Sequence, residues 1–320
     1  MIFANHFETA PFFLGIFMKK TSIFLILLLI CLSLSGCARK PEATDIAATT
    51  LPVFEFTQAL CHGTDLTVGR LISEPVSCLH DYSLNVNQVR QAESADLIIL
   101  SGAGLEEFME DILAGKPSVD ASQGISLLEG EAHDHDGHDH EEEHAHDAHE
   151  EHHHHEDDPH IWLSPANAKI MAANICTGLS DRYPQWKTIF STNLDDLLSR
   201  LDALEQYGQD RLSQLSCREL ITFHDGFAYF AQAFDLEILA AVEEESGSEA
   251  SAKELIELIR LAREHQLPAI FVEQNGSTSA ADILSRETGA KTYVLDMAMA
   301  GDSYFEAMYR NIDTIKEALG

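Results

Sequence analysis

The stretch PQWKTIFSTNLDDLLSRLDALEQYGQDRLSQL, from Pro184 to Leu215, divides the chain into two parts of similar pattern. Proline suits the first turn of a helix, and apolar residues then recur at helical spacing: Ile189, Leu194, Leu197, Leu201, Leu204 and Leu212. The pattern predicts a linking helix over residues 184–216. At 1.5 Å per residue it would be roughly 45 Å long and could act as a rigid connector.

Short strand candidates alternate with helix candidates on both sides of this helix. Ala95–Leu100 (ADLIIL) is an uninterrupted apolar run, as is typical of a buried parallel strand. The other expected strands are residues 45–50 and 66–72 before the helix, and 219–223, 237–242, 269–273 and 291–295 after it. The alternation predicts an α/β fold with two lobes of mostly parallel sheet, residues 45–183 and 217–320.

The charge of the chain excludes some functions. There are 20 Lys and Arg against 53 Asp and Glu, which gives a formal net charge of −33. This balance argues against nucleic acid as a partner and suits a protein that attracts cations. Gly102 and Gly104 superficially resemble a dinucleotide fingerprint, but the third glycine is missing and Glu106 would repel phosphate.

One segment is dominated by histidine and acids: residues 133–160 read HDHDGHDHEEEHAHDAHEEHHHHEDDPH. With almost no apolar side chains it predicts a disordered loop over residues 129–158. Neutral imidazole is the commonest metal ligand, and the acids attract divalent cations. We expect a weak metal-collecting loop, whose histidines are His133, His135, His138, His140, His144, His146, His149, His152, His153, His154 and His155.

The N-terminal region carries an export signal. Residues 18–37 read MKKTSIFLILLLICLSLSGC, which is two lysines, an apolar run and a small-residue site. This is a secretory signal, too short for a lasting membrane span. Leu34–Cys37 resembles a bacterial lipobox, so we expect Cys37 to carry a lipid that anchors the protein outside the cell membrane. Whether translation starts at Met1 or Met18 is left open.

Four further cysteines fall in the exported part: Cys61, Cys78, Cys176 and Cys217. An even number in an oxidising compartment predicts disulfides, and three connectivities are possible. We favour Cys61–Cys78, which would close a short loop, and Cys176–Cys217.

Three histidines outside the loop stand at positions suited to ligands. His80 lies in a loop after a strand, His160 in the turn DPHIWLSP, and His224 directly after the strand ITF. Asp296 ends another strand, and ligands collect at the carboxyl ends of strands in open α/β sheets. Three histidines and one aspartate predict a tetrahedral site suited to Zn²⁺ and poor for Mg²⁺ or Ca²⁺.

Several segments resemble, in order, the zinc/manganese solute-binding proteins of ABC importers: GRLISEPVSCLHDYSL, ADLIILSGAGLEEFM, DPHIWLSPANAKIMA, TFHDGFAYFA and FVEQNGSTSAADILSRETGAKTYVLDM. The resemblance runs from about Ile46 to Leu319. It implies two α/β lobes joined by the long helix, a metal ion in the cleft between them, and an ABC permease with its cytoplasmic ATPase as partner. The family's ligands fall on His80, His160, His224 and Asp296.

The third ligand position indicates which metal is preferred. Manganese-type members of the family tend to place a carboxylate there, whereas His224 is the choice that favours zinc. Leu79 stands where zinc members often have an acid or proline, which leaves Asp296 as the favoured fourth ligand and water as the alternative. Asp81, Asp225 and Glu273 are candidates for orienting the imidazoles, or alternatively caps and surface residues.

The resemblance implies a monomeric, extracytoplasmic Zn²⁺-binding component of an ABC transporter rather than an enzyme. The alternatives are a manganese-binding component or a metal-buffering or adhesive surface lipoprotein. A zinc hydrolase is less favoured because the HExxH spacing occurs only inside the histidine-rich loop, at His140–His144 and His149–His153, and not around His80, His160 or His224. We expect the loop to be dispensable for tight binding.

Overall fold

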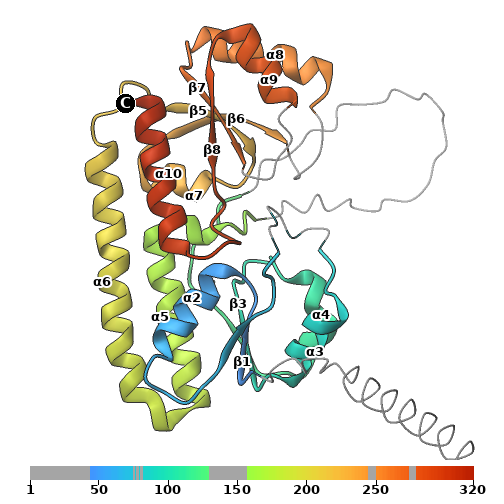
Figure 1. Cartoon of the computed structure of the whole chain (residues 1–320), viewed down its shortest axis with the longest axis vertical. Coiled ribbons are helices and arrows are strands. Elements are labelled where there is room, and N and C mark those ends of the chain that lie inside the picture. The colour runs from blue at the N-terminus through green and yellow to red at the C-terminus, as the bar shows by residue number, and fades with distance from the viewer. Residues whose placement is uncertain are drawn as a thin grey trace, which may run out of the picture. The chain divides into compact units, whose positions relative to one another are not determined.

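The computed structural model describes residues 44–74, 76, 79, 82–129, 157–243, 250–273 and 279–320. The export signal, Cys37 and the histidines of the acidic loop lie outside these ranges. Two four-stranded sheets form the framework (Figure 1). Their strand orders are β2-β1-β3-β4 and β6-β5-β7-β8. Every pair of neighbouring strands in them is parallel, which confirms the predicted α/β fold.

The first sheet is formed by β1 (Ile46–Ala48), β2 (Val68–Arg70), β3 (Leu97–Leu100) and β4 (Ser118–Asp120). β1 and β3 are its central strands, and their apolar side chains are almost completely buried. The edge strand β4 was not expected, because three residues with only one apolar side chain give no strand pattern. The helices of this part are α2 (Leu51–Leu60), α3 (Val86–Ser94) and α4 (Glu110–Leu113), the last preceded by the 3-10 turn η1 (Glu107–Met109).

The second sheet is formed by β5 (Glu219–His224), β6 (Glu237–Glu243), β7 (Ala269–Glu273) and β8 (Lys291–Leu295). Its helices are α7 (Ala228–Ala233), α8 (Ala252–Glu264), α9 (Ser279–Thr288) and α10 (Tyr304–Leu319). Apolar residues of α8 and α9 pack on one face of the sheet, while α7 and α10 contribute to the larger core on the other. Both faces are therefore covered, as parallel sheets require.

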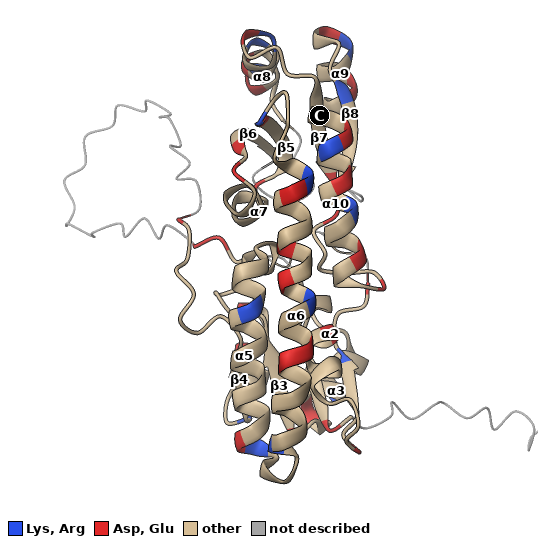
Figure 2. Cartoon of the chain, turned by 90° about the vertical axis from the view of Figure 1, so that its left-hand side faces the viewer, with Lys and Arg blue, Asp and Glu red and all other residues tan. Residues whose placement is uncertain are grey.

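The long helix of the prediction is present as α6 (Lys187–Leu212), which follows the 3-10 turn η3 (Pro184–Trp186) and α5 (Pro165–Arg182). Figure 2 shows α6 beside α5 at one end and beside α10 at the other. Lys169 of α5 binds two carboxylates of α6, Asp202 at 2.8 Å and Glu205 at 2.7 Å. Asp313 of α10 accepts hydrogen bonds from Tyr207 and Arg211 of α6. The helix is thus fastened to helices from both parts of the chain.

The predicted disulfides were wrong for the cysteines that the structure describes. Cys61, Cys176 and Cys217 are all free thiols, and Cys78 lies outside the described ranges. Cys176 is buried within α5, whereas Cys217 precedes β5 and donates a hydrogen bond to the carbonyl of Glu219. Burial raises the pKa of the Cys61 thiol to about 12, so this side chain stays protonated and unreactive near neutral pH. Within the same ranges, no helix has the length and apolar character needed to cross a membrane.

Glu106 is a buried carboxylate at the carboxyl ends of β1 and β3. It accepts hydrogen bonds from the hydroxyl of Thr49 (2.6 Å) and from the backbone N–H groups of Ser101 (2.8 Å) and Gly102 (3.0 Å). The turn that superficially resembled a phosphate-binding loop therefore binds a carboxylate of its own chain. Despite these bonds, burial raises the pKa of Glu106 to about 7.

This pKa predicts how stability depends on pH. Between about pH 4.5 and pH 7 the folded chain retains a proton on Glu106 that the unfolded chain has lost, so stability falls as pH rises through that window. Glu106→Gln has no proton to lose at this position. We therefore expect the wild type to lose about 3 kcal/mol more unfolding free energy than this variant as the pH rises through the window. Urea unfolding at pH 4.5 and pH 7.5 measures this, and parallel profiles for the two proteins would contradict it.

Candidate metal centre

Two of the predicted ligands, His160 and His224, meet in the structure. Their Nε2 atoms are 3.3 Å apart, and the two rings are nearly perpendicular, with centroids 5.0 Å apart. Both side chains are buried, with about 2% of each residue exposed. The two residues are 64 positions apart in the sequence: His160 precedes α5, and His224 is the last residue of β5.

Each imidazole has a carboxylate on its far side. Asp158 Oδ1 lies 2.8 Å from His160 Nδ1 and also accepts the backbone N–H of His160. Glu273 Oε1 lies 3.8 Å from His224 Nδ1. At 2.8 Å, Asp158 favours the tautomer of His160 that keeps the proton on Nδ1, which directs the Nε2 lone pair toward the candidate metal position. The 3.8 Å contact of Glu273 Oε1 favours the same tautomer of His224 electrostatically.

The register of the second sheet accounts for one of these pairs. Thr222 of β5 is paired with Phe271 of β7, so His224 and Glu273, two residues further along each strand, reach the same carboxyl edge. Glu273 is itself paired with Leu295 of β8, and Asp296 follows directly. Three predicted site residues thus leave neighbouring strands at one edge.

Trp162 attaches His160 to this edge. Its side chain is fully buried in the 3-10 turn η2 (Ile161–Leu163), and its indole N–H donates to the carbonyl of Met297 at 2.7 Å. The ring of His160 contacts the Trp162 ring edge-to-face, with centroids 5.5 Å apart. The indole thereby links the segment that carries His160 to the segment that follows β8.

Asp296 makes several bonds of its own. Its carboxylate accepts the N–H of Ala298 at 2.8 Å and pairs with the guanidinium of Arg310 at 3.0 Å. The side chain of Asn311 bonds to both the backbone N–H and the backbone carbonyl of Asp296. Within the described ranges, no three His, Cys, Asp or Glu side chains are grouped closely enough to hold an ion, so Asp296 is not brought into contact with the histidine pair.

Two predicted residues, His80 and Asp81, lie outside the described ranges. Asp225 is half-buried directly after His224. The assignments of these three residues, and that of Asp296 as a ligand, remain predictions.

Sequence reasoning did not assign a role to Asp158 or Gly226. The disordered loop predicted over residues 129–158 was wrong at its end, because Asp158 is buried and bonded to His160. An aspartate two residues before a candidate ligand is a usable signal in the sequence. Gly226 lies against both rings: a Cβ atom there would be 2.7 Å from His224 Cδ2, 3.0 Å from His160 Nδ1 and 2.6 Å from Met297 Cε. Only glycine leaves room for the pair, and this requirement appears only in three dimensions.

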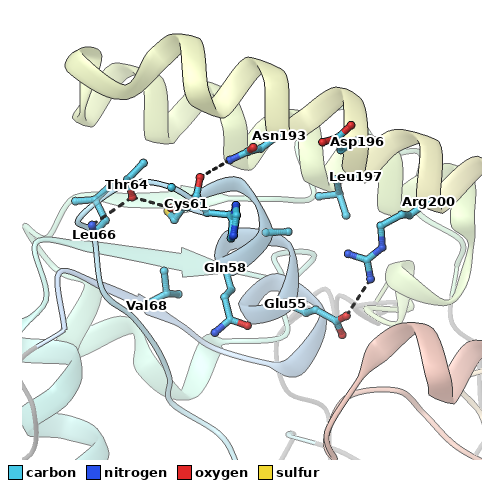
Figure 3. A pocket seen from close by; sticks show the side chains of 13 residues that line it. Glu55, Gln58, Cys61, Thr64, Leu66, Val68, Asn193, Asp196, Leu197 and Arg200 are labelled. Carbon is cyan, nitrogen blue, oxygen red and sulfur yellow. Dashed lines mark hydrogen bonds and ion pairs between the residues drawn. The ribbon is translucent and has the colours of Figure 1, made fainter.

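A separate pocket of about 680 Å³ lies between α2 and α6 (Figure 3). It includes none of the predicted ligands. Its charged residues include Glu55 and Arg200, which pair with each other at 3.5 Å. The histidine pair is therefore the better candidate for a metal site.

Gly226→Ala should lower the zinc affinity of the candidate site more than it lowers the stability of the fold. The added methyl group must displace one of the two imidazoles or Met297, so we expect zinc affinity to fall at least tenfold. The matched control is Gly289→Ala, at a turn with φ +79° and nothing within 4 Å of the added atom. The control should lose about 1–2 kcal/mol of stability through strain but keep its zinc affinity. Equal zinc affinities in both variants, measured by chelator competition, would exclude the proposed contact.

Comparison with known proteins identifies the family to which the chain belongs. Residues 46–318 match the family model described as zinc-uptake complex component A, periplasmic. The zinc-binding lipoprotein AdcA of Streptococcus pneumoniae is 31% identical over 319 residues, covering 94% of this chain but 61% of AdcA. The chain thus spans about three fifths of the length of that relative.

Solved structures show the same fold. A crystal structure of ZnuA, 28% identical, superposes with a TM-score of 0.72 and covers 87% of this chain and 100% of ZnuA. The Zn(II)-bound AdcA of S. pneumoniae, 26% identical, gives 0.69, with 87% of this chain and 58% of AdcA covered. From the matched residues and the shared fold, the chain belongs to the family of zinc-uptake complex component A proteins.

Proposed function

We propose that this protein captures Zn²⁺ outside the cell membrane and delivers it to the permease of an ABC importer. The observation that carries the proposal is the 3.3 Å separation of the His160 and His224 Nε2 atoms. Two nitrogens bound to one tetrahedral zinc ion at 2.0–2.1 Å are about 3.3–3.4 Å apart. The two imidazoles are thus spaced as a zinc ion would hold them.

The full coordination sphere is part of the proposal. His80 would supply the third imidazole and Asp296 the fourth ligand, with water as the alternative. Asp296 pairs with Arg310, which is largely exposed, so a divalent ion could replace the guanidinium without burying it. A nitrogen-rich set favours zinc over manganese, and manganese is the alternative cargo.

The delivery role needs binding and release but no bond chemistry. Glu273 lies behind His224, on the Nδ1 side, where it can orient the ring rather than act as a base at an open metal position. We therefore propose a binding component and not an enzyme. The membrane anchor at Cys37, the monomeric state and the permease with its ATPase belong to the same proposal, which is supported by the zinc-binding lipoprotein among the relatives.

Competitive titration with Zn²⁺ and Mn²⁺ of the chain from Ala38 onward tests the proposal. We expect one tight zinc site that survives deletion of residues 133–155, because none of these residues is a proposed ligand. His224→Ala should weaken zinc binding on the order of 100-fold or more, since it removes a ligand. His265→Ala is the matched control. His265 lies away from the site, where its Nδ1 is 3.0 Å from a carboxylate oxygen of Glu219. This variant should bind zinc as the wild type does.

Two results would contradict parts of the proposal. Tight binding that disappears with residues 133–155 and ignores His224 would indicate a metal-buffering surface protein instead. A single tight site that prefers manganese would change the cargo but keep the delivery role.

A further inference from the structure

The hydroxyl of Tyr229 joins two segments that are far apart in the sequence. Tyr229 lies on α7 and is buried, and its oxygen accepts the N–H of Leu128 at 2.9 Å and donates to the carbonyl of Asp158 at 2.9 Å. Burial raises the pKa of this phenol to about 12, so near neutral pH the hydroxyl keeps the proton that it donates. Both bonds are therefore available under ordinary conditions.

Leu128 and Asp158 are also bonded to each other. The N–H of Asp158 donates to the carbonyl of Leu128 at 2.9 Å, and the neighbouring residues Glu129 and Asp157 form an antiparallel bridge. Two chain segments that are 30 residues apart thus meet, and Tyr229 bonds to one residue of each.

Asp158 connects this network to the metal site. One oxygen of its carboxylate accepts from the backbone N–H of His160 at 2.9 Å and lies 2.8 Å from the ring Nδ1. Moving the main chain of Asp158 would therefore move the group that orients the imidazole. Tyr229 follows His224 by only five residues. The segment formed by β5 and α7 therefore carries the proposed ligand His224 and also bonds to Asp158, which contacts the other proposed ligand, His160.

We propose that Tyr229 is a positioning residue for metal binding, whose hydroxyl holds Asp158 so that His160 presents Nε2 to His224 before any metal arrives. This inference rests on the proposed function, because it concerns the affinity of that same site. A preorganised pair binds a metal more tightly than a loose pair, since less ordering remains to be done on binding. Outer partners of metal-binding histidines commonly change metal affinity 10- to 100-fold when they are mutated.

Tyr229→Phe tests the proposal, because it removes the hydroxyl and keeps the ring. We expect zinc affinity to fall about 10- to 100-fold in chelator competition. In metal-free protein labelled with ¹⁵N-histidine, His160 should show a single Nδ1–H tautomer in the wild type and a mixture in the variant. The matched control is Tyr207→Phe, whose hydroxyl bonds to Asp313 at 2.8 Å between α6 and α10, and it should change neither readout.

Several outcomes would overturn the proposal. One is a folded Tyr229→Phe protein with wild-type zinc affinity, and another is one that retains the single His160 tautomer. If the variant does not fold, hydrogen exchange of the Leu128 amide in the wild type decides. Coupling is reciprocal, so zinc should slow this exchange, and an unchanged rate overturns the proposal.

The tautomer of His160 also distinguishes a failure of the proposed zinc-binding function from a failure of the positioning role of Tyr229. A wild type without a tight zinc site would refute the proposed function. A single tautomer that is lost in Tyr229→Phe would still support the positioning role of the hydroxyl in that protein.

Discussion

The constraint on which the site depends is the approach of two buried imidazole nitrogens to 3.3 Å. If both Nε2 atoms present lone pairs, they repel each other, and if both carry protons, the two N–H groups collide. One shared proton or one cation between them resolves the conflict. Because Asp158 and Glu273 lie on the Nδ1 sides, the favoured tautomers direct lone pairs toward the gap, which suits a cation.

The fold supplies this geometry through two kinds of connection. Parallel strands end at a common edge, which brings His224 of β5 beside Glu273 of β7 by sheet register alone. His160 lies outside the sheets and needs tertiary bonds to reach the same edge. The indole of Trp162 supplies one such bond to Met297, and the hydroxyl of Tyr304 returns another to the carbonyl of Trp162 at 2.8 Å. Regular structure places one histidine, and buried side chains place the other.

This difference explains what the sequence could predict. The βα alternation and the long helix follow from apolar periodicity, and most strands lie where that pattern places them. His224 could be found because a strand-end histidine stands out in the sequence. Asp158 was harder to assign because thirteen other acids precede it from Glu129 onward, so its burial could not be read from the local charge. Gly226 and Tyr229 act only through contacts with residues far along the chain, and no local pattern marks such contacts. The predicted disulfides were wrong because an even number of cysteines does not indicate which thiols are neighbours in the fold.

Charge also distinguishes the kind of ligand that the centre can accept. Asp158 and Glu273 are both less than 8% exposed, and they lie behind rings that are neutral unless protonated. Burying two carboxyl groups beside neutral imidazoles is unfavourable unless positive charge is placed close by. Protonating both rings would supply that charge, but it would set two N–H groups against each other across 3.3 Å. A single divalent cation between the rings supplies the same charge and binds both lone pairs at once. The two carboxyl groups behind the rings thus favour a cation over an anion between the imidazoles, whether that cation is one shared proton or a metal ion.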